Sequence, residues 1–159
     1  MSTKNSYSPL QIGLHWAIAA LIIANWFISE GMDHVFDGSL EGQAVTGFMP
    51  RFHVYAGVAV LVLALLRLAV RMRSGAPKAE GEGLSAMVAH LGHMALYILM
   101  IAVPALGAIT WFGGIDATAD LHVLAMNVMM ILFLAHAAAA LFHQYVLKDR
   151  TLLRMMRSE

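Results

Sequence analysis

The stretch from residue 121 to residue 147, LHVLAMNVMMILFLAHAAAALFHQYVL, decides the fold of this chain. It contains no Asp, Glu, Lys or Arg, and it exceeds the roughly 20 mostly apolar residues that a helix needs to cross a bilayer. It nevertheless carries three histidines, His122, His136 and His143. Ionisable side chains are rare within membrane spans and usually serve a function. The stretch therefore predicts a membrane helix with a chemical role.

Three more charge-poor runs precede it, and together they predict an all-α protein. We expect an integral membrane four-helix bundle that forms a single domain over residues 1–159, with helices near 9–29, 50–72, 87–112 and 121–147. The second helix reaches spanning length only if Arg67 and Arg71 lie at its end, where long side chains can snorkel.

The ends of two helices carry local signals. Ser8-Pro9-Leu10-Gln11 combines a capping hydroxyl, a proline at the first helical position and a glutamine three residues after the cap. Gly113-Gly114 predicts the end of the third helix. The first helix lacks a small-residue cleavage site after its apolar run, so we expect a retained helix and not a signal peptide.

Composition supports this class of protein. Hydrophobic residues make up 60% of the 159 residues and charged residues 13%, against about 25% charged in soluble domains. The formal net charge is zero, so the basic excess of a nucleic-acid-binding protein is missing. Because there is no cysteine, thiolate metal sites and iron–sulfur clusters are excluded, and metal chemistry must rest on the eight histidines.

Basic residues predict the orientation. Nine of the ten lie on the side shared by both termini, and only Arg51 lies on the other side. Both termini are therefore expected in the cytoplasm, with the chain in the inner membrane. The opposite face should be acidic, because its loops carry Glu30, Asp33, Asp37, Glu41, Asp116 and Asp120.

Depth along the helices sorts the histidines into pairs. His53 and His122 start the second and fourth helices on the outer side, so they can face each other. His136 follows His122 by 14 residues, which is about 21 Å of rise and nearly four turns, so both point the same way. His15, on the first helix, is the natural partner for His136, provided that the fourth helix tilts or protrudes. His34 is expected in a loop.

Two histidines on opposing helices can bind either a bare metal ion or the iron of a haem from both faces. A macrocycle needs room, and each of the four histidines has a small neighbour one turn onward. These neighbours are Ala19, Ala56, Gly57, Ala125, Ala139 and Ala140. The pattern favours haem.

Four other polar residues have open roles. Arg67 shares a face with His53 and lies at the depth of the inner pair. It could be the counter-charge for a haem propionate, or it could snorkel to the membrane surface and help to determine the topology. His143 continues the face of His136 to the cytoplasmic surface, where it could hydrogen-bond a propionate or a quinone, or cap the helix. His90 and His93 share a turn at the inner end of the third helix, where a polar role at headgroup level competes with a catalytic one.

These residues resemble the bacterial cytochrome b561 family of dihaem membrane cytochromes. The resemblance covers nearly the whole chain. It rests on the opening motif from Tyr7 to Trp16, on Ala89-His90-Leu91-Gly92-His93, and on His136-Ala137-Ala138-Ala139-Ala140 into His143 and Lys148-Asp149. It implies two haem b groups, one ligated by His15 and His136 and the other by His53 and His122.

The resemblance also implies a function, because a closely similar member of the family is a superoxide oxidase that passes electrons from superoxide to ubiquinone. We expect this chain to be a superoxide:ubiquinone oxidoreductase-like membrane cytochrome with ubiquinone as electron acceptor. One alternative is an electron-transfer subunit docked to a periplasmic dehydrogenase or hydrogenase, for which the acidic loops would receive the partner. A distant alternative is a divalent-metal transporter that uses histidine pairs as ion sites.

Overall fold

The computed structural model describes residues 6–77 and 83–158, and its regular elements are all helical. Four of them are long and apolar enough to span a membrane, which confirms the predicted architecture. The elements are α1 (Pro9–Ile28), α2 (Met32–Leu40), α3 (Phe48–Ser74), α4 (Leu84–Gly113) and α5 (Ala119–Phe142). A π-helical segment, η2 (His143–Leu147), continues α5, and short 3-10 turns lie at η1 (Asp116–Thr118) and η3 (Leu153–Met155).

The predicted helix ends at Ser8 and Gly113 are confirmed. The Ser8 backbone N–H donates to the Gln11 side chain over 3.0 Å, and the Gln11 backbone N–H donates to the Ser8 hydroxyl over 3.3 Å, which completes a capping box. Gly114 follows α4 with φ +62°, a left-handed conformation that glycine adopts without steric cost.

The placement of His34 in a loop is wrong, because residues 32–40 form the short helix α2 and His34 lies within it. Phe36 supplies the reason. Its side chain is buried on one face of α2 and packs on Trp111 of α4, with ring centres 6.3 Å apart. This apolar contact anchors on α4 a helix whose sequence, rich in polar residues, is typical of a loop.

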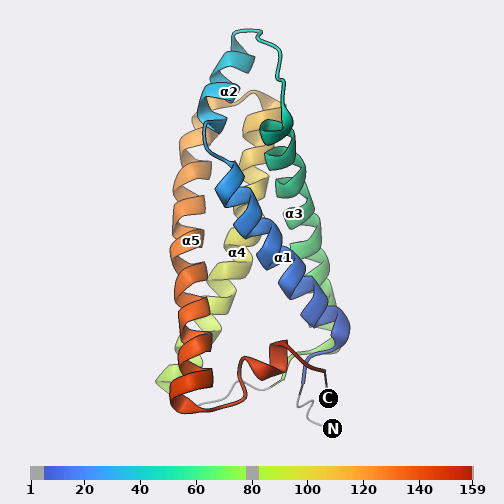
Figure 1. Cartoon of the computed structure of the whole chain (residues 1–159), viewed down its shortest axis with the longest axis vertical. Coiled ribbons are helices and arrows are strands. Elements are labelled where there is room, and N and C mark those ends of the chain that lie inside the picture. The colour runs from blue at the N-terminus through green and yellow to red at the C-terminus, as the bar shows by residue number, and fades with distance from the viewer. Residues whose placement is uncertain (1–5, 78–82, 159) are drawn as a thin grey trace.

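Figure 1 shows an elongated bundle in which α1 runs obliquely across α3 and α4. The helix α2 lies at one end, here called the α2 end, and the beginning of α1 and the segment η3 lie at the other, here called the terminal end. Along the bundle α1 packs on α3, α3 on α4, and α4 on α5. The core between the two ends is apolar and consists of Ile18, Ile22, Val60, Val103, Met129 and Met130. It separates two polar regions.

Candidate functional site

His53 and His122 meet at the α2 end, as predicted from their depth. Their ring centres lie 6.2 Å apart, with the ring planes at 85°. The Nδ1 atom of His122 is 2.8 Å from the carbonyl oxygen of Val103 on α4. The Nδ1 atom of His53 is buried and has no hydrogen-bond partner. One ring is therefore oriented by the helix backbone, and the other carries an orphaned polar atom.

A cavity of about 550 Å³ adjoins this pair. That volume lies within the roughly 300–1,000 Å³ typical of sites for small molecules and cofactors. Its lining includes Asn25, Gly57 and Met126 together with both histidines. The Oδ1 atom of Asn25 is also buried without a partner, and a Cβ built on Gly57 would meet no atom within 4 Å. Orphaned polar atoms and open space beside two imidazoles fit a planar cofactor ligated through nitrogen.

The terminal end holds a group of three histidines. His15 and His136 have ring centres 6.3 Å apart, as the proposed pairing requires, but His93 lies nearer to His136, at 5.2 Å. The sequence did not indicate that His93 would join this group. Its neighbourhood depends on how α4 crosses α5, which the rise along a single helix does not define.

Distance decides which of these pairs could share one iron. Two imidazoles that bind a metal from opposite sides, each with its nitrogen about 2 Å from the metal, have ring centres roughly 6 Å apart. The separations of 6.3 Å for His15–His136 and 6.2 Å for His53–His122 meet this requirement. At 5.2 Å, His93 and His136 are too close for it.

Arg67 is a buried cation beside the three-histidine group. Its side chain donates to the carbonyl oxygen of Gln11 and to the hydroxyl of Tyr97, each over 3.0 Å. The Gln11 side chain in turn donates to the carbonyl oxygen of Gly75 over 2.9 Å. In the described part of the chain no acidic side chain pairs with Arg67. An anionic group of a cofactor would neutralise a charge that the protein itself leaves uncompensated.

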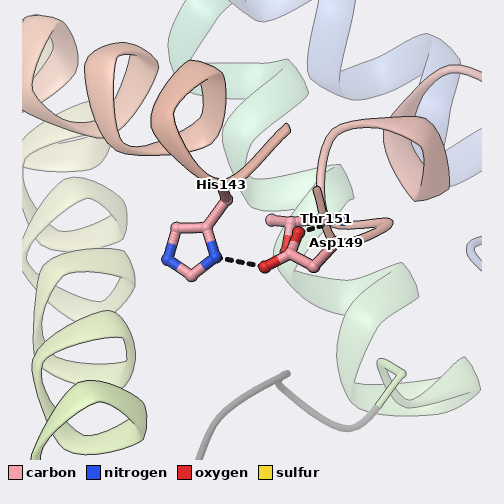
Figure 2. Close-up of polar contacts among 3 residues, drawn as sticks. All are labelled: His143, Asp149 and Thr151. Atoms are coloured by element: carbon pink, nitrogen blue, oxygen red, sulfur yellow. Dashed lines mark hydrogen bonds and ion pairs between the residues drawn. The ribbon is translucent and has the colours of Figure 1, made fainter. Parts of the chain in front are cut away.

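His143 lies where α5 passes into η2, at the terminal end. Its Nδ1 donates to the carboxylate of Asp149, a contact that sequence reasoning missed (Figure 2). Partial burial raises the pKa of the Asp149 carboxyl, but hydrogen bonds from His143 and Thr151 outweigh this effect and hold the pKa below its usual value. His90, by contrast, is exposed on α4.

Over residues 6–77 and 83–158, no three or more His, Cys, Asp or Glu side chains are arranged so that together they could hold one bare metal ion, and this includes the three-histidine group. A transporter for bare divalent ions normally surrounds its cargo with several oxygen ligands. The paired arrangement therefore lends no support to the metal-transport alternative.

Four membrane helices that hold opposed histidine pairs near both ends define a class, the membrane proteins built to bind haem in a helical bundle. Comparison with known proteins is more specific. The model of the family described as prokaryotic cytochrome b561 matches residues 6–158. The chain therefore belongs to the prokaryotic cytochrome b561 family, whose members are membrane electron-transfer proteins with b-type haem.

Three relatives match almost end to end. The chain is 45% identical to cytochrome b562 of Cereibacter sphaeroides, with 99% of each chain covered. It is 36% identical to the probable superoxide oxidase CybB of Yersinia pestis, covering 94% of this chain and 95% of the relative. It is 32% identical to cytochrome b561 homolog 1 of Escherichia coli K12, covering 96% and 97%. No solved structure gives a significant match.

Proposed function

We propose that this cytochrome binds two b haems, one between His15 and His136 and one between His53 and His122, and moves electrons from superoxide to ubiquinone. The single observation that carries the haem assignment is the pair of separations, 6.3 Å and 6.2 Å, at the two ends of the bundle. When bound, haem would supply one-electron redox chemistry, and with both histidines of a pair holding its iron no position would remain for oxygen. Electrons would therefore be exchanged at the haem edge.

The chain's own residues would orient the cofactors and offset their charge. The Val103 carbonyl accepts the Nδ1 proton of His122, which leaves Nε2 of that ring for the iron. Arg67, already fixed by Gln11 and Tyr97, would offset the charge of a propionate at the terminal end. His143 would bind the ubiquinone head group at the terminal end, where its side chain is 32% exposed.

Support for superoxide as donor comes from the printed name of the Yersinia pestis relative. The charge of the α2 end argues against superoxide as the donor. Its acidic side chains are all exposed, namely those of Glu30, Asp33, Asp37, Glu41, Asp116 and Asp120. This surface would repel an anion unless Arg51, His34 and the propionates form a local positive path. It would instead attract a cationic periplasmic protein, so docking to a dehydrogenase or hydrogenase is the second candidate function.

Two measurements test the haem assignment and the donor. Pyridine haemochrome analysis of the purified protein should give two b haems per chain, and a value near one would contradict the pairing. Rapid mixing with superoxide and a soluble ubiquinone should then reduce the haems and form ubiquinol. If the haems stay oxidised, superoxide is not the donor and the docked-subunit function takes its place.

We further propose an inner-membrane location with both termini in the cytoplasm. The sequence distribution of basic residues supports this, because nine of ten fall in segments that are expected on the side of the termini. A reporter fused after Glu159 should be active only as a cytoplasmic enzyme. Activity of a periplasm-specific reporter at that position would show the opposite orientation.

A further inference from the structure

The segment that follows α5 folds back on His143. At Lys148 the backbone adopts the left-handed conformation, with φ 57°, and the chain reverses. The reversal returns Asp149 to the beginning of η2, where its backbone N–H donates to the His143 carbonyl oxygen over 3.2 Å. Its carboxylate meets Nδ1 of the His143 ring in the same place (Figure 2). One residue thus contacts both the backbone and the side chain of His143.

The Asp149 carboxylate is itself held in place. Its Oδ2 accepts the proton of His143 Nδ1, and its Oδ1 accepts the backbone N–H of Thr151 over 2.9 Å. Farther along, the indole N–H of Trp16 on α1 donates to the carbonyl oxygen of Met155 over 2.7 Å. The segment from Asp149 to Met155 therefore links α5 to α1 across the terminal end. Both carboxylate oxygens have fixed donors.

These contacts determine which nitrogen of the His143 ring carries the proton in the neutral imidazole. An ionised carboxylate only accepts hydrogen bonds, so the ring nitrogen that faces it must carry the proton. In the neutral ring the other nitrogen, Nε2, then keeps a lone pair. Figure 2 shows that nitrogen pointing away from Asp149, on a side chain that remains partly exposed. Nε2 is the atom available for proton exchange with a ligand.

We propose that Asp149 is a positioning residue for quinone reduction, which fixes His143 as the Nδ1-protonated tautomer and stabilises its imidazolium, so that Nε2 delivers protons to a quinone oxygen. This inference rests on the proposed function of His143. Reduction of one ubiquinone to ubiquinol takes two electrons and two protons, and oxidation of two superoxide ions to two oxygen molecules supplies the electrons. For each proton an Nε2–H bond breaks and a quinone O–H bond forms, after which water on the same side of the membrane returns a proton to Nε2.

A carboxylate that accepts a hydrogen bond from one imidazole nitrogen, while the other nitrogen exchanges protons, has two effects. It keeps the ring in the orientation and tautomer that the reaction needs, and it lowers the energy of the charged ring. Asp149→Asn retains the size of the side chain but loses the charge. Its amide can also offer an N–H to Nδ1, which would favour the wrong tautomer. Asp149→Glu keeps the charge and offers partial rescue.

The first test reads the tautomer directly. The protein is labelled with ¹⁵N-histidine and reduced, because bis-histidine ferrous haem is diamagnetic, and His143→Gln identifies the resonances of residue 143. The wild-type ring should be protonated at Nδ1, and Asp149→Asn should shift the population toward the Nε2–H form. Identical spectra in the two proteins would overturn the inference.

The second test measures electron transfer from the reduced haems to ubiquinone in the absence of superoxide. Reduced protein is mixed with a soluble ubiquinone, and haem reoxidation and ubiquinol formation are followed. Asp149→Asn should slow reoxidation by roughly 10-fold to 100-fold with unchanged haem content, and Asp149→Glu should recover part of the rate. Glu30→Gln, which removes an exposed carboxylate at the α2 end, serves as the control and should match the wild type.

The outcomes separate this inference from the proposed function. If ubiquinone reoxidises the wild type and Asp149→Asn equally fast, Asp149 has no positioning role and the proposed acceptor stands. If ubiquinone does not oxidise even the wild type, the proposed acceptor fails and this inference fails with it. A variant that has lost haem counts as misfolded, and Asp149→Glu then decides the result through its haem content and rate.

Discussion

The Nδ1 atom of His122 lies 2.8 Å from the carbonyl oxygen of Val103, and this contact ties α5 to α4 beside the cavity at the α2 end. A carbonyl oxygen only accepts, so Nδ1 must donate and Nε2 keeps its lone pair. Val103 also belongs to the apolar core. The ring of His122 is therefore oriented by the packed interior, which is the arrangement expected of a metal-ligating histidine.

Replacing His122 should remove one haem. His122→Ala removes one of the two histidines that would hold this haem and leaves the three-histidine group at the terminal end unchanged. We expect the haem content to fall from about two per chain to about one, with the remaining spectrum still typical of a b-type cytochrome. Pyridine haemochrome analysis measures this directly. Retention of both haems would contradict the His53–His122 pairing.

The open space at Gly57 provides a second test of the same cavity. A Cβ at Gly57 meets nothing within 4 Å, and the residue lines the cavity, so Gly57→Leu should fold but fill space that the macrocycle needs. We expect loss of one haem with the helical content preserved. Gly13→Leu is the matched control, because Gly13 also has no atom within 4 Å but is exposed on α1.

A full haem complement in Gly57→Leu would mean that the cavity is not the cofactor site. Circular dichroism on the same samples shows whether the helices have formed. Loss of haem in Gly13→Leu as well would assign the effect to helix packing and would remove the support that Gly57 gives to the site.

The histidine pairs could be predicted from the sequence because helical rise is regular. Ser8 and Gly113 marked helix ends, and the 14 residues between His122 and His136 placed both on one face. The helix α2 could not be found in this way, because Asp33, Asp37 and Gly38 give its sequence a polar character, and the packing of Phe36 on Trp111 is a tertiary contact.

Two contacts depend on geometry that no sequence pattern encodes. His93 approaches His136 to 5.2 Å because of the relative placement of α4 and α5. Asp149 reaches His143 because α5 widens into a π-helical turn and Lys148 takes a left-handed conformation. Neither lysine nor the sequence of residues 143–147 has a strong preference for these conformations. Both contacts therefore became visible only in three dimensions.

The three-histidine group gives a prediction that distinguishes the histidines that would bind the haem iron from a nearby histidine that would not. Because the His93–His136 separation is too short to hold an iron between the rings, His93→Ala should retain both haems, whereas His15→Ala should lose one. His90→Ala, one turn earlier on the same helix, should also retain both and serves as the control. Haem loss in His93→Ala with retention in His15→Ala would reassign the partner of His136 to His93.

Arg67 should set the redox potential of the haem at the terminal end. Its charge is buried, and removing it by Arg67→Gln favours the ferric iron, which carries one more positive charge than the ferrous iron. The expected effect is on the order of 1 kcal/mol, a fall of tens of millivolts for one of the two haems. Arg51→Gln, at the exposed α2 end, should leave that potential unchanged. A potentiometric titration in which Arg67→Gln matches the wild type would remove Arg67 from the haem environment.

The contact between Asp149 and His143 should be lost in acid. The pKa of the Asp149 carboxyl is lowered in the folded protein from its ordinary value of 3.8, so the carboxylate binds fewer protons when folded than when unfolded. Its contribution to stability is therefore complete above the ordinary pKa and disappears as the pH falls through the lowered pKa. The backbone N–H of Thr151, which donates to Asp149 Oδ1, reports on this contact by hydrogen exchange.

After correction for intrinsic exchange rates, protection of the Thr151 amide should not decrease from about pH 7 to about pH 5, and it should fall below the ordinary carboxyl pKa. Asp149→Asn should lower the protection above the ordinary carboxyl pKa, where the wild-type side chain is ionised, because a neutral amide oxygen is the weaker acceptor. Protection that already falls between about pH 7 and pH 5 would show that a group other than the Asp149 carboxyl controls the segment. Equal protection in Asp149→Asn would show that the carboxylate does not hold it.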